Sequence, residues 1–167
     1  MRHLVSMLLQ NEAGALARVA GLFAARGYNI ESLTVAATPD VDVSRLTLVV
    51  FGDEAVIDQI VKQSAKLVDV IEIGELTARE HVERELLVVR FDAPEAAADT
   101  CLARYGARLL HRSGTQSVME YTGNAAEVDD FLDALRQRGE IVDHARSGIA
   151  AIERPQIPAG ATAQALL

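Results

Sequence analysis

The sequence predicts an α+β fold made of two ferredoxin-like units, each with the element order βαββαβ. Two observations lead to this prediction. Apolar runs of strand length alternate with segments in which apolar residues recur every three or four positions, as on one face of a helix. The same order of runs then appears a second time, within a chain of 167 residues that is long enough for two small units.

The first unit begins with an apolar strand over residues 2–10. A helix over 14–26 follows, and Gly27 stands directly after it, where a left-handed glycine commonly ends a helix. Residues 29–38 are expected to form the second strand. The apolar positions of the helix follow the spacing i, i+3, i+4 and i+7: Leu16, Val19, Ala20 and Phe23.

The rest of the first unit follows the same logic. Thr38-Pro39-Asp40 marks a turn. In the segment 43–51 the positions Arg45, Thr47 and Val49 alternate with Leu46, Leu48 and Val50, as expected of a strand with two different faces. Asp53 is expected to cap a second helix, and 68–76 completes the sheet. The shared face of that helix is formed by Val56, Ile57, Ile60, Val61 and Ser64.

The second unit repeats this order. A strand over 85–91 leads into a helix that Asp92 and Pro94 open and that runs to about Arg104. Two strands, 108–112 and 116–122, are expected around a Ser-Gly-Thr turn. The helix should turn three residues toward the core: Ala97, Cys101 and Leu102.

The last helix and strand close the second unit. Asn124 with Glu127 three residues later resembles a capping box, and Gly139 is expected to end the helix. A single final strand is predicted over 141–152. The core positions of the helix are Val128, Phe131, Leu132 and Leu135.

The domain boundaries follow from these elements. The first unit spans 1–77 and the second spans 78–153, with the polar residues 77–82 as the connector. Residues 154–167 are rich in Pro, Ala and Gly without periodicity, so we expect a flexible tail.

Composition excludes several classes of protein. The formal charge is −8 and only two lysines are present, so the basic face that nucleic acid or an anionic membrane requires is missing. Cys101 is the only cysteine and lies at an apolar helical position, which favours a buried core thiol. With no signal peptide and no apolar run near the ~20 residues that span a bilayer, we expect a cytoplasmic protein.

No enzymatic motif is found. The four histidines lack metal-ligand spacing, and no phosphate loop, nucleophile elbow or dinucleotide fingerprint occurs. We therefore predict a protein without catalytic residues and without a metal site of its own.

The polar loop Asn11–Gly14 between the first strand and the first helix has two interpretations. Asn11 can form an Asx-turn, with Gly14 allowing tight packing at the helix start. Alternatively, the N–H groups of Gly14, Ala15 and Leu16 hold an α-carboxylate, helped by the helix dipole, and the Asn11 oxygen accepts from an α-ammonium. In that case a Cβ at Gly14 would crowd the ligand.

Asn29 also has two interpretations. It can satisfy the turn that follows Gly27, or it can reach a carboxylate across an interface, with Ile30 beside it. A four-stranded sheet has exposed edges that invite pairing with a second copy, so the ligand hypothesis predicts a homodimer.

Two segments, 11–19 and 22–36, resemble the ACT domain of the small regulatory subunit of acetolactate synthase. The block Arg26–Ala36 is the most specific part, and the similarity extends over about 1–152 with weaker agreement at 92–140. The resemblance implies an N-terminal ACT domain followed by a C-terminal ACT-like domain. Position 17 is Ala where many relatives carry Ser.

The resemblance also implies a function. A non-catalytic subunit of this kind activates a separate large subunit, which carries thiamine diphosphate, Mg²⁺ and FAD, and confers feedback inhibition by valine or a related branched-chain amino acid. The effector-binding positions that it implies are Asn11, Gly14, Ala15 and Leu16 on one copy with Asn29 and Ile30 on the other, with Thr34 and Ala36 lining the interface. The alternative is a free-standing ACT-type amino-acid sensor that regulates another enzyme or transcription.

Overall fold

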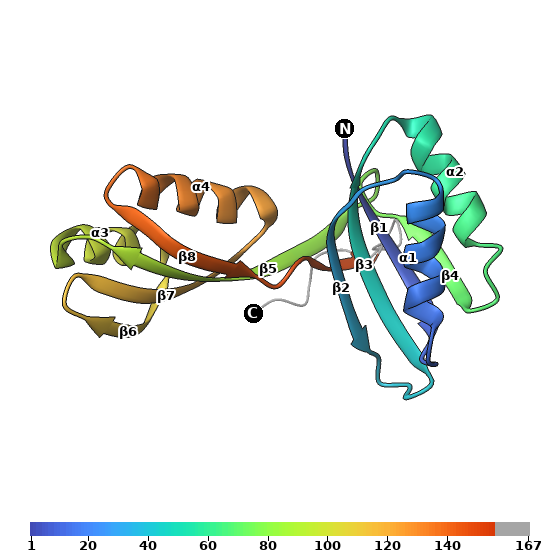
Figure 1. Ribbon diagram of the computed structural model, residues 1–167, viewed down its shortest axis with the longest axis horizontal. Helices are drawn as coiled ribbons and strands as arrows, with labels where there is room; N and C mark the ends of the chain where they lie inside the picture. The colour runs from blue at the N-terminus through green and yellow to red at the C-terminus, as the bar shows by residue number, and fades with distance from the viewer. Residues whose placement is uncertain (156–167) are drawn as a thin grey trace, which may run out of the picture.

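The computed structural model describes residues 1–155, which form two units linked along one long strand (Figure 1). The predicted tail over 154–167 lies outside the described residues from position 156 onward. Each unit carries two helices and an antiparallel sheet built on the order βαββαβ, so the predicted fold class is confirmed. The first sheet has four strands, and the second has a fifth, short strand at its C-terminal end.

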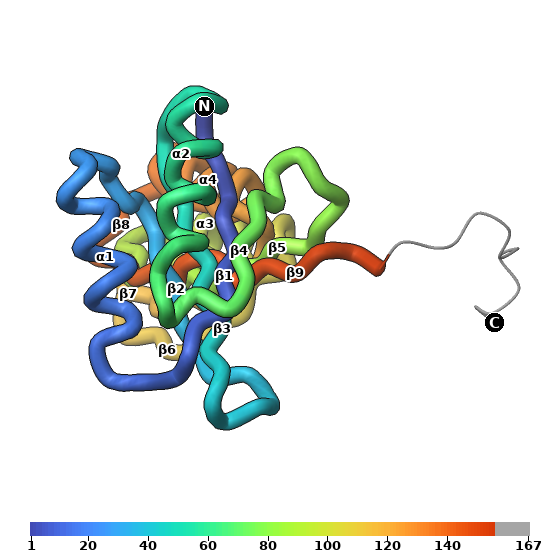
Figure 2. The backbone as a smooth tube through the Cα atoms, turned by 90° about the vertical axis from the view of Figure 1, so that its right-hand side faces the viewer, coloured from blue at the N-terminus to red at the C-terminus, as the bar shows by residue number. Residues whose placement is uncertain are grey.

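The first unit has strands in the order β2-β3-β1-β4, so β2 and β4 are the edges of its sheet. Figure 2 shows α1 and α2 side by side on one face of this sheet. The elements are β1 (Arg2–Gln10), α1 (Ala15–Ala25), β2 (Ile30–Ala37), β3 (Val43–Phe51), α2 (Glu54–Ser64) and β4 (Val70–Glu75).

The helix ends of the first unit follow the predicted chemistry. The carboxylate of Asp53 accepts a hydrogen bond from the Val56 N–H at 2.9 Å, which caps α2. Gly27 has a φ of +70°, the left-handed conformation expected where α1 ends. The two helices then bury their apolar faces against one side of the sheet, in a core formed by Val5, Met7, Leu9, Val19, Phe23, Leu46, Leu48, Val50, Ile57 and Ile60.

The second unit has strands in the order β6-β7-β5-β8. Asn124 Oδ1 accepts from the Glu127 N–H at 2.9 Å while Glu127 Oε2 accepts from the Asn124 N–H at 2.7 Å, so the predicted capping box is confirmed. The elements are β5 (His81–Asp92), α3 (Glu95–Tyr105), β6 (Arg108–Ser113), β7 (Gln116–Gly123), α4 (Ala125–Arg136), β8 (Glu140–Arg146) and β9 (Ala150–Glu153).

The core of the second unit confirms the predicted inward residues of α3, with Ala97 and Leu102 packed against it, and adds one more. Cys101 is buried as expected, and burial raises the pKa of its thiol. Ala98 is fully buried on the same face of α3, whereas Ala97 is only partly buried against the core. The fully packed residues are Leu87, Val89, Phe91, Ala98, Cys101, Met119, Val128, Phe131 and Leu135.

The predicted final strand over 141–152 is wrong as a single element. The structure divides it into β8 and β9, with a break at residues 147–149 where Gly148 has a φ of +78°. The β5 strand also begins at His81, inside the predicted connector, because β9 pairs with its first residues, His81–Arg84. These pairings are long-range, so local sequence does not reveal them.

The β9 strand crosses back to the first unit. Ile149 and Ala151 are buried against Leu4, Val49 and Leu76, on the face of the first sheet that α1 and α2 leave open. The second unit is thereby joined to the first by the chain entering β5 and by the chain leaving β8 (Figure 1).

Candidate functional site

The loop between β1 and α1 is held against the connection between β2 and β3. The Asn11 N–H donates to the Asp42 carbonyl at 2.7 Å, and its Nδ2 donates to the Val41 carbonyl at 2.8 Å. The Ser44 hydroxyl donates to Asn11 Oδ1 at 3.0 Å. These contacts replace the Asx-turn considered from the sequence, and they leave Oδ1 one further lone pair for a ligand.

Gly14 is the N-cap of α1 and has a φ of +91°, a conformation that favours glycine. A Cβ at this position would lie 2.8 Å from Nη1 of Arg18. The need for glycine therefore has a backbone cause and a packing cause, in addition to the room for a ligand suggested by the sequence.

The first turn of α1 presents amide groups. The Ala15 N–H bonds to the Glu12 carbonyl at 3.2 Å, and the Ala15 side chain is buried. The N–H groups of Leu16 and Ala17 belong to the first turn and have no intrahelical acceptor. Together with the positive end of the helix dipole, such N–H groups can donate to an anion.

Arg18 and Asp69 support this loop, and the sequence reasoning missed them. Arg18 Nε and Nη2 donate to the two Asp69 carboxylate oxygens at 2.6 and 2.5 Å. Asp69 is only 2% exposed, and the guanidinium hydrogen bonds lower the pKa of its carboxyl group. The signal in the sequence was an arginine four positions after Gly14, which places its side chain over the loop.

Asn29 and Ile30 lie at the other end of α1. A helix of 11 residues separates them from Gly14 by about 16 Å at 1.5 Å per residue. Asn29 is exposed and Ile30 packs on the first core. The structure therefore brings together Asn11, Gly14, Ala15 and Leu16 but not Asn29 and Ile30 within one copy.

Thr34 and Ala36 point to the opposite face of the sheet from α1, because Thr34 pairs with Thr47 and Ala36 with Arg45 rather than with the core positions of β3. The Thr34 hydroxyl donates to the Ser147 carbonyl at 3.2 Å, in the second unit. Thr34 therefore contacts the second unit of its own chain.

The β2 strand is an open edge. It pairs on one side with β3 and, within the described residues, with no strand on the other. Val35 on this strand is 40% exposed and Leu16 on α1 is 39% exposed. An exposed edge beside exposed apolar side chains is a suitable place for strand pairing with another chain.

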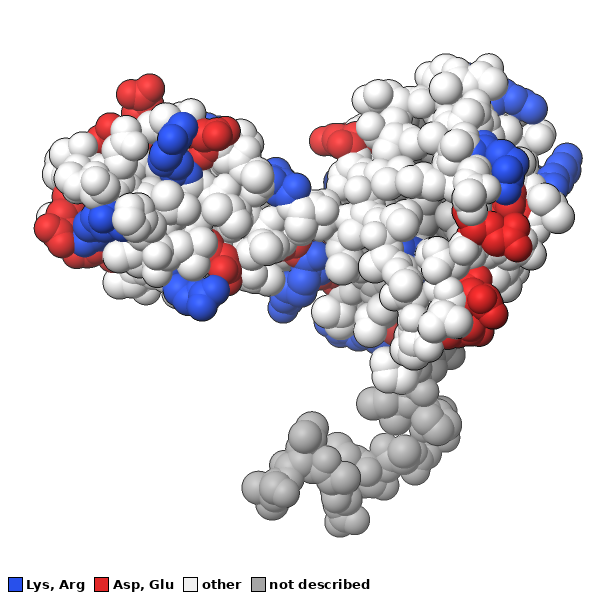
Figure 3. All heavy atoms as spheres, turned by 60° about the horizontal axis from the view of Figure 1, so that its bottom comes forward, with Lys and Arg blue, Asp and Glu red and all other residues white. Residues whose placement is uncertain are grey.

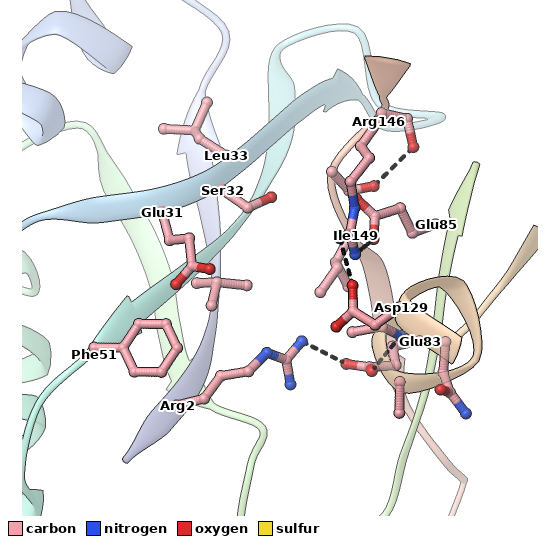
Figure 4. A pocket seen from close by; sticks show the side chains of 16 residues that line it. Arg2, Glu31, Ser32, Leu33, Phe51, Glu83, Glu85, Asp129, Arg146 and Ile149 are labelled. Atoms are coloured by element: carbon pink, nitrogen blue, oxygen red, sulfur yellow. Dashed lines mark hydrogen bonds and ion pairs between the residues drawn. The ribbon is translucent and has the colours of Figure 1, made fainter. Parts of the chain in front are cut away.

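A cleft of about 870 Å³ lies between the two units. Figure 4 shows Glu31 and Phe51 of the first unit facing Asp129 and Arg146 of the second across it. Arg2 spans the cleft to Glu83 at 3.3 Å.

The cationic groups of the cleft are already paired. Arg146 donates to Glu85 at 3.0 and 2.5 Å and to Asp129 at 2.7 Å, which raises the pKa of its guanidinium group. Glu85 itself is 4% exposed. Since these carboxylates neutralise the guanidinium, Arg146 offers no free positive charge to the cleft.

Within residues 1–155, no helix is both long and apolar enough to cross a membrane, and no group of His, Cys, Asp or Glu side chains is arranged to hold a metal ion. Figure 3 shows acidic and basic side chains interspersed over the visible face of both units rather than gathered into one basic patch.

The βαββαβ unit with a glycine loop at the start of its first helix and an open β2 edge defines an ACT domain. Residues 5–72 match the model of the AHAS small subunit-like ACT domain, and residues 84–155 match that of the small subunit of acetolactate synthase. The chain belongs to the acetolactate synthase small-subunit family.

Individual relatives agree with this assignment. The acetolactate synthase isozyme 3 small subunit of Salmonella typhimurium is 44% identical over 159 residues, which cover 92% of this chain and 96% of that protein. A probable acetolactate synthase small subunit from Archaeoglobus fulgidus is 42% identical over 157 residues, with 92% and 98% coverage. The crystal structure of the acetolactate synthase small subunit from Thermotoga maritima matches with a TM-score of 0.83 at 33% identity, covering 94% of this chain and 99% of that one.

Proposed function

We propose that this chain is the regulatory subunit of an acetolactate synthase: it binds a large catalytic subunit, raises its activity and confers feedback inhibition by valine. The relatives are named small subunits, which implies a larger partner. Thiamine diphosphate, Mg²⁺ and FAD are proposed to reside on that partner.

One observation carries the proposal. The loop with Asn11 and Gly14 and the pair Asn29 and Ile30, which we call the two half-sites, lie at opposite ends of α1 in one copy. The Gly14 loop lies beside the end of β2, since Asn11 bonds to the connection that follows this strand, whereas Ile30 begins β2. Antiparallel pairing of two β2 edges about a two-fold axis would bring the Ile30 end of one copy to the Gly14 loop of the other. One dimer would then hold two equal effector sites.

The chemistry of each site suits a small aliphatic amino acid. The first-turn amides and the helix dipole would hold the α-carboxylate, and the second lone pair of Asn11 Oδ1 would accept from the α-ammonium. Asn29 of the second copy would complete the polar contacts. The exposed apolar surface at Leu16 and Val35 would cover the isopropyl group, whose full burial is worth roughly 1.5–3 kcal/mol.

Inhibition requires that valine bind one arrangement of the complex better than the other. A tenfold preference corresponds to about 1.4 kcal/mol, which a few amide hydrogen bonds and one buried isopropyl group can supply.

Reconstitution tests this function. The purified chain is added to the large subunit from the same organism, and the rate of acetolactate formation is measured with and without valine. We expect the chain to raise the rate and valine to lower it again. If the chain leaves the rate unchanged but the purified chain binds valine on its own, the result would instead support the alternative, a free-standing amino-acid sensor.

A further inference from the structure

Thr34 lies on β2, the edge strand at which the effector is proposed to bind, and it contacts the second unit. Its hydroxyl donates to the Ser147 carbonyl at 3.2 Å, from the face of β2 opposite to α1. A single strand therefore carries the open edge of the first unit and a direct contact to the second. A shift of β2 on effector binding would reach Ser147 without any intervening residue.

Gly148 makes this contact possible. It has a φ of +78°, and a Cβ there would lie 2.5 Å from Thr34 Oγ1 and 2.9 Å from Ser32 Oγ. The chain between β8 and β9 thus lies directly on two hydroxyl side chains of β2. A larger residue would require the Thr34 and Ser32 hydroxyls to shift or the two units to move apart.

Ser147 is fixed within the second unit. Its N–H donates to the Leu86 carbonyl at 2.9 Å, and its hydroxyl oxygen accepts from the Leu86 N–H at 3.0 Å. The preceding Arg146 is held on the buried Glu85 by two hydrogen bonds. A displacement of Ser147 is therefore passed to β5 and β8 rather than absorbed by a loose segment.

The cleft beside this contact leaves the units room to move. Its volume is about 870 Å³, and Figure 4 shows open space between Glu31 and Phe51 on one wall and Asp129 on the other. Arg2 and Glu83 reach across it, and this ion pair can lengthen or shorten as the walls separate or approach.

We propose that the contact of Thr34 with Ser147 and Gly148 couples effector binding at the edge of β2 to the position of the second unit. When the effector binds and β2 shifts, this contact would shift the second unit relative to the first. The inference rests on the proposed function and names the route of its regulation. Thr34 is thus a positioning residue outside the effector site. An effector changes an equilibrium only through interactions that differ between two arrangements, and this contact is one that a shift of β2 would make or break.

Two substitutions test the route. Thr34→Val removes the hydroxyl and keeps the shape of the side chain, whereas Gly148→Ala inserts a methyl group between Gly148 and the Thr34 side chain. Thr122→Val, at an exposed position of β7, controls for loss of a threonine hydroxyl from a strand. Gly114→Ala controls for backbone strain, because Gly114 has a φ of +58° with open space around it.

Valine binding to the small subunit alone is measured by calorimetry, and inhibition is measured in the reconstituted complex relative to each variant's own rate without valine. We expect both variants to bind valine within about threefold of the native affinity. The fraction of the rate removed by saturating valine should fall by at least about half, since one hydrogen bond is comparable to a typical coupling free energy. Both controls should behave like the native protein.

The outcomes separate the two proposals. Native inhibition in a folded Thr34→Val variant would overturn the transmission route alone. Loss of valine binding in that variant would also overturn it, because Thr34 would then belong to the effector site. A native protein that binds no valine would overturn the proposed function together with the inference. Thermal unfolding confirms that each variant is folded, and Thr34→Val decides the question if Gly148→Ala does not fold.

Discussion

Gly14 shows how one residue can satisfy several requirements at the same place. It is the N-cap of α1 with a φ of +91°, its missing Cβ leaves room for the Arg18 guanidinium, and in the proposed site it would leave the first-turn amides open to a ligand. The sequence pointed to this position through the glycine and its place before an apolar helix. It did not reveal Arg18 and Asp69, because their pairing joins residues 51 positions apart.

Substitution at Gly14 tests the ligand role of the loop. Gly14→Asp adds a carboxylate next to Arg18 and beside the amides, where it would compete with the carboxylate of valine. We expect valine inhibition to be lost, with the half-inhibitory concentration raised more than about a hundredfold, equivalent to roughly 2.8 kcal/mol. Asn11→Ala should act in the same direction.

The control for this prediction is activation. Both variants are expected to raise the rate of the large subunit in the absence of valine. If activation is lost together with inhibition, the loop serves folding or docking to the large subunit instead.

The Asp69 carboxylate gives the fold a defined pH dependence. Its pKa is lowered in the folded protein, so the stabilisation from the Arg18 pair is present above the unfolded pKa of about 3.9 and is lost as the pH falls through the lower folded value. Asp69→Asn should therefore lower the melting temperature at pH 7, and the difference from the native protein should shrink below about pH 4. A difference that is constant from pH 7 to pH 3 would contradict this assignment.

At the level of elements, caps and periodicity were readable from the sequence, but pairing partners were not. Asp53 and Asn124 cap their helices with the side-chain contacts that their spacing predicted. The break at Gly148 was missed, because an isolated glycine can also lie within a strand or at a bulge. The positive φ of Gly148 breaks the strand, and Ser32 and Thr34, more than a hundred positions away in the sequence, leave no room for a Cβ there.

The inward face of α3 was predicted, but one of its residues was not. Alanine occupies several faces of this helix, so a small apolar side chain carries little information about which face is buried. Ala98, rather than Ala97, proves to be the fully buried member of the pair.

The capping box of α4 yields a prediction at this scale. Asn124→Ala removes the acceptor for the Glu127 N–H and is expected to destabilise the protein by about 1 kcal/mol, a decrease of roughly 2–4 °C in melting temperature. Asp130→Ala, on the exposed side of the same helix, is the matched control and should change stability by less than about 0.5 kcal/mol. Equal effects of the two substitutions, measured by thermal denaturation, would contradict the role of the cap.

At the level of the whole molecule, the two groups of residues predicted to bind the effector lie at opposite ends of α1 in a single copy. The residues implied by the family resemblance are therefore meaningful only in an assembly, and the open β2 edge is the surface that would form it. Sequence alone suggested a dimer from the exposed edge, and the positions of Gly14 and Ile30 supply the geometric reason for antiparallel pairing.

A mixed dimer tests the shared site most directly. Gly14→Asp chains and Asn29→Ala chains, carrying different affinity tags, are combined, and the mixed dimers are isolated through both tags. Each mixed dimer would hold one site with both substitutions and one with neither. We predict that neither parent dimer binds valine measurably, whereas the mixed dimer binds about half as much valine per dimer as the native protein. A mixed dimer that binds no valine would show that the two half-sites do not come from different copies.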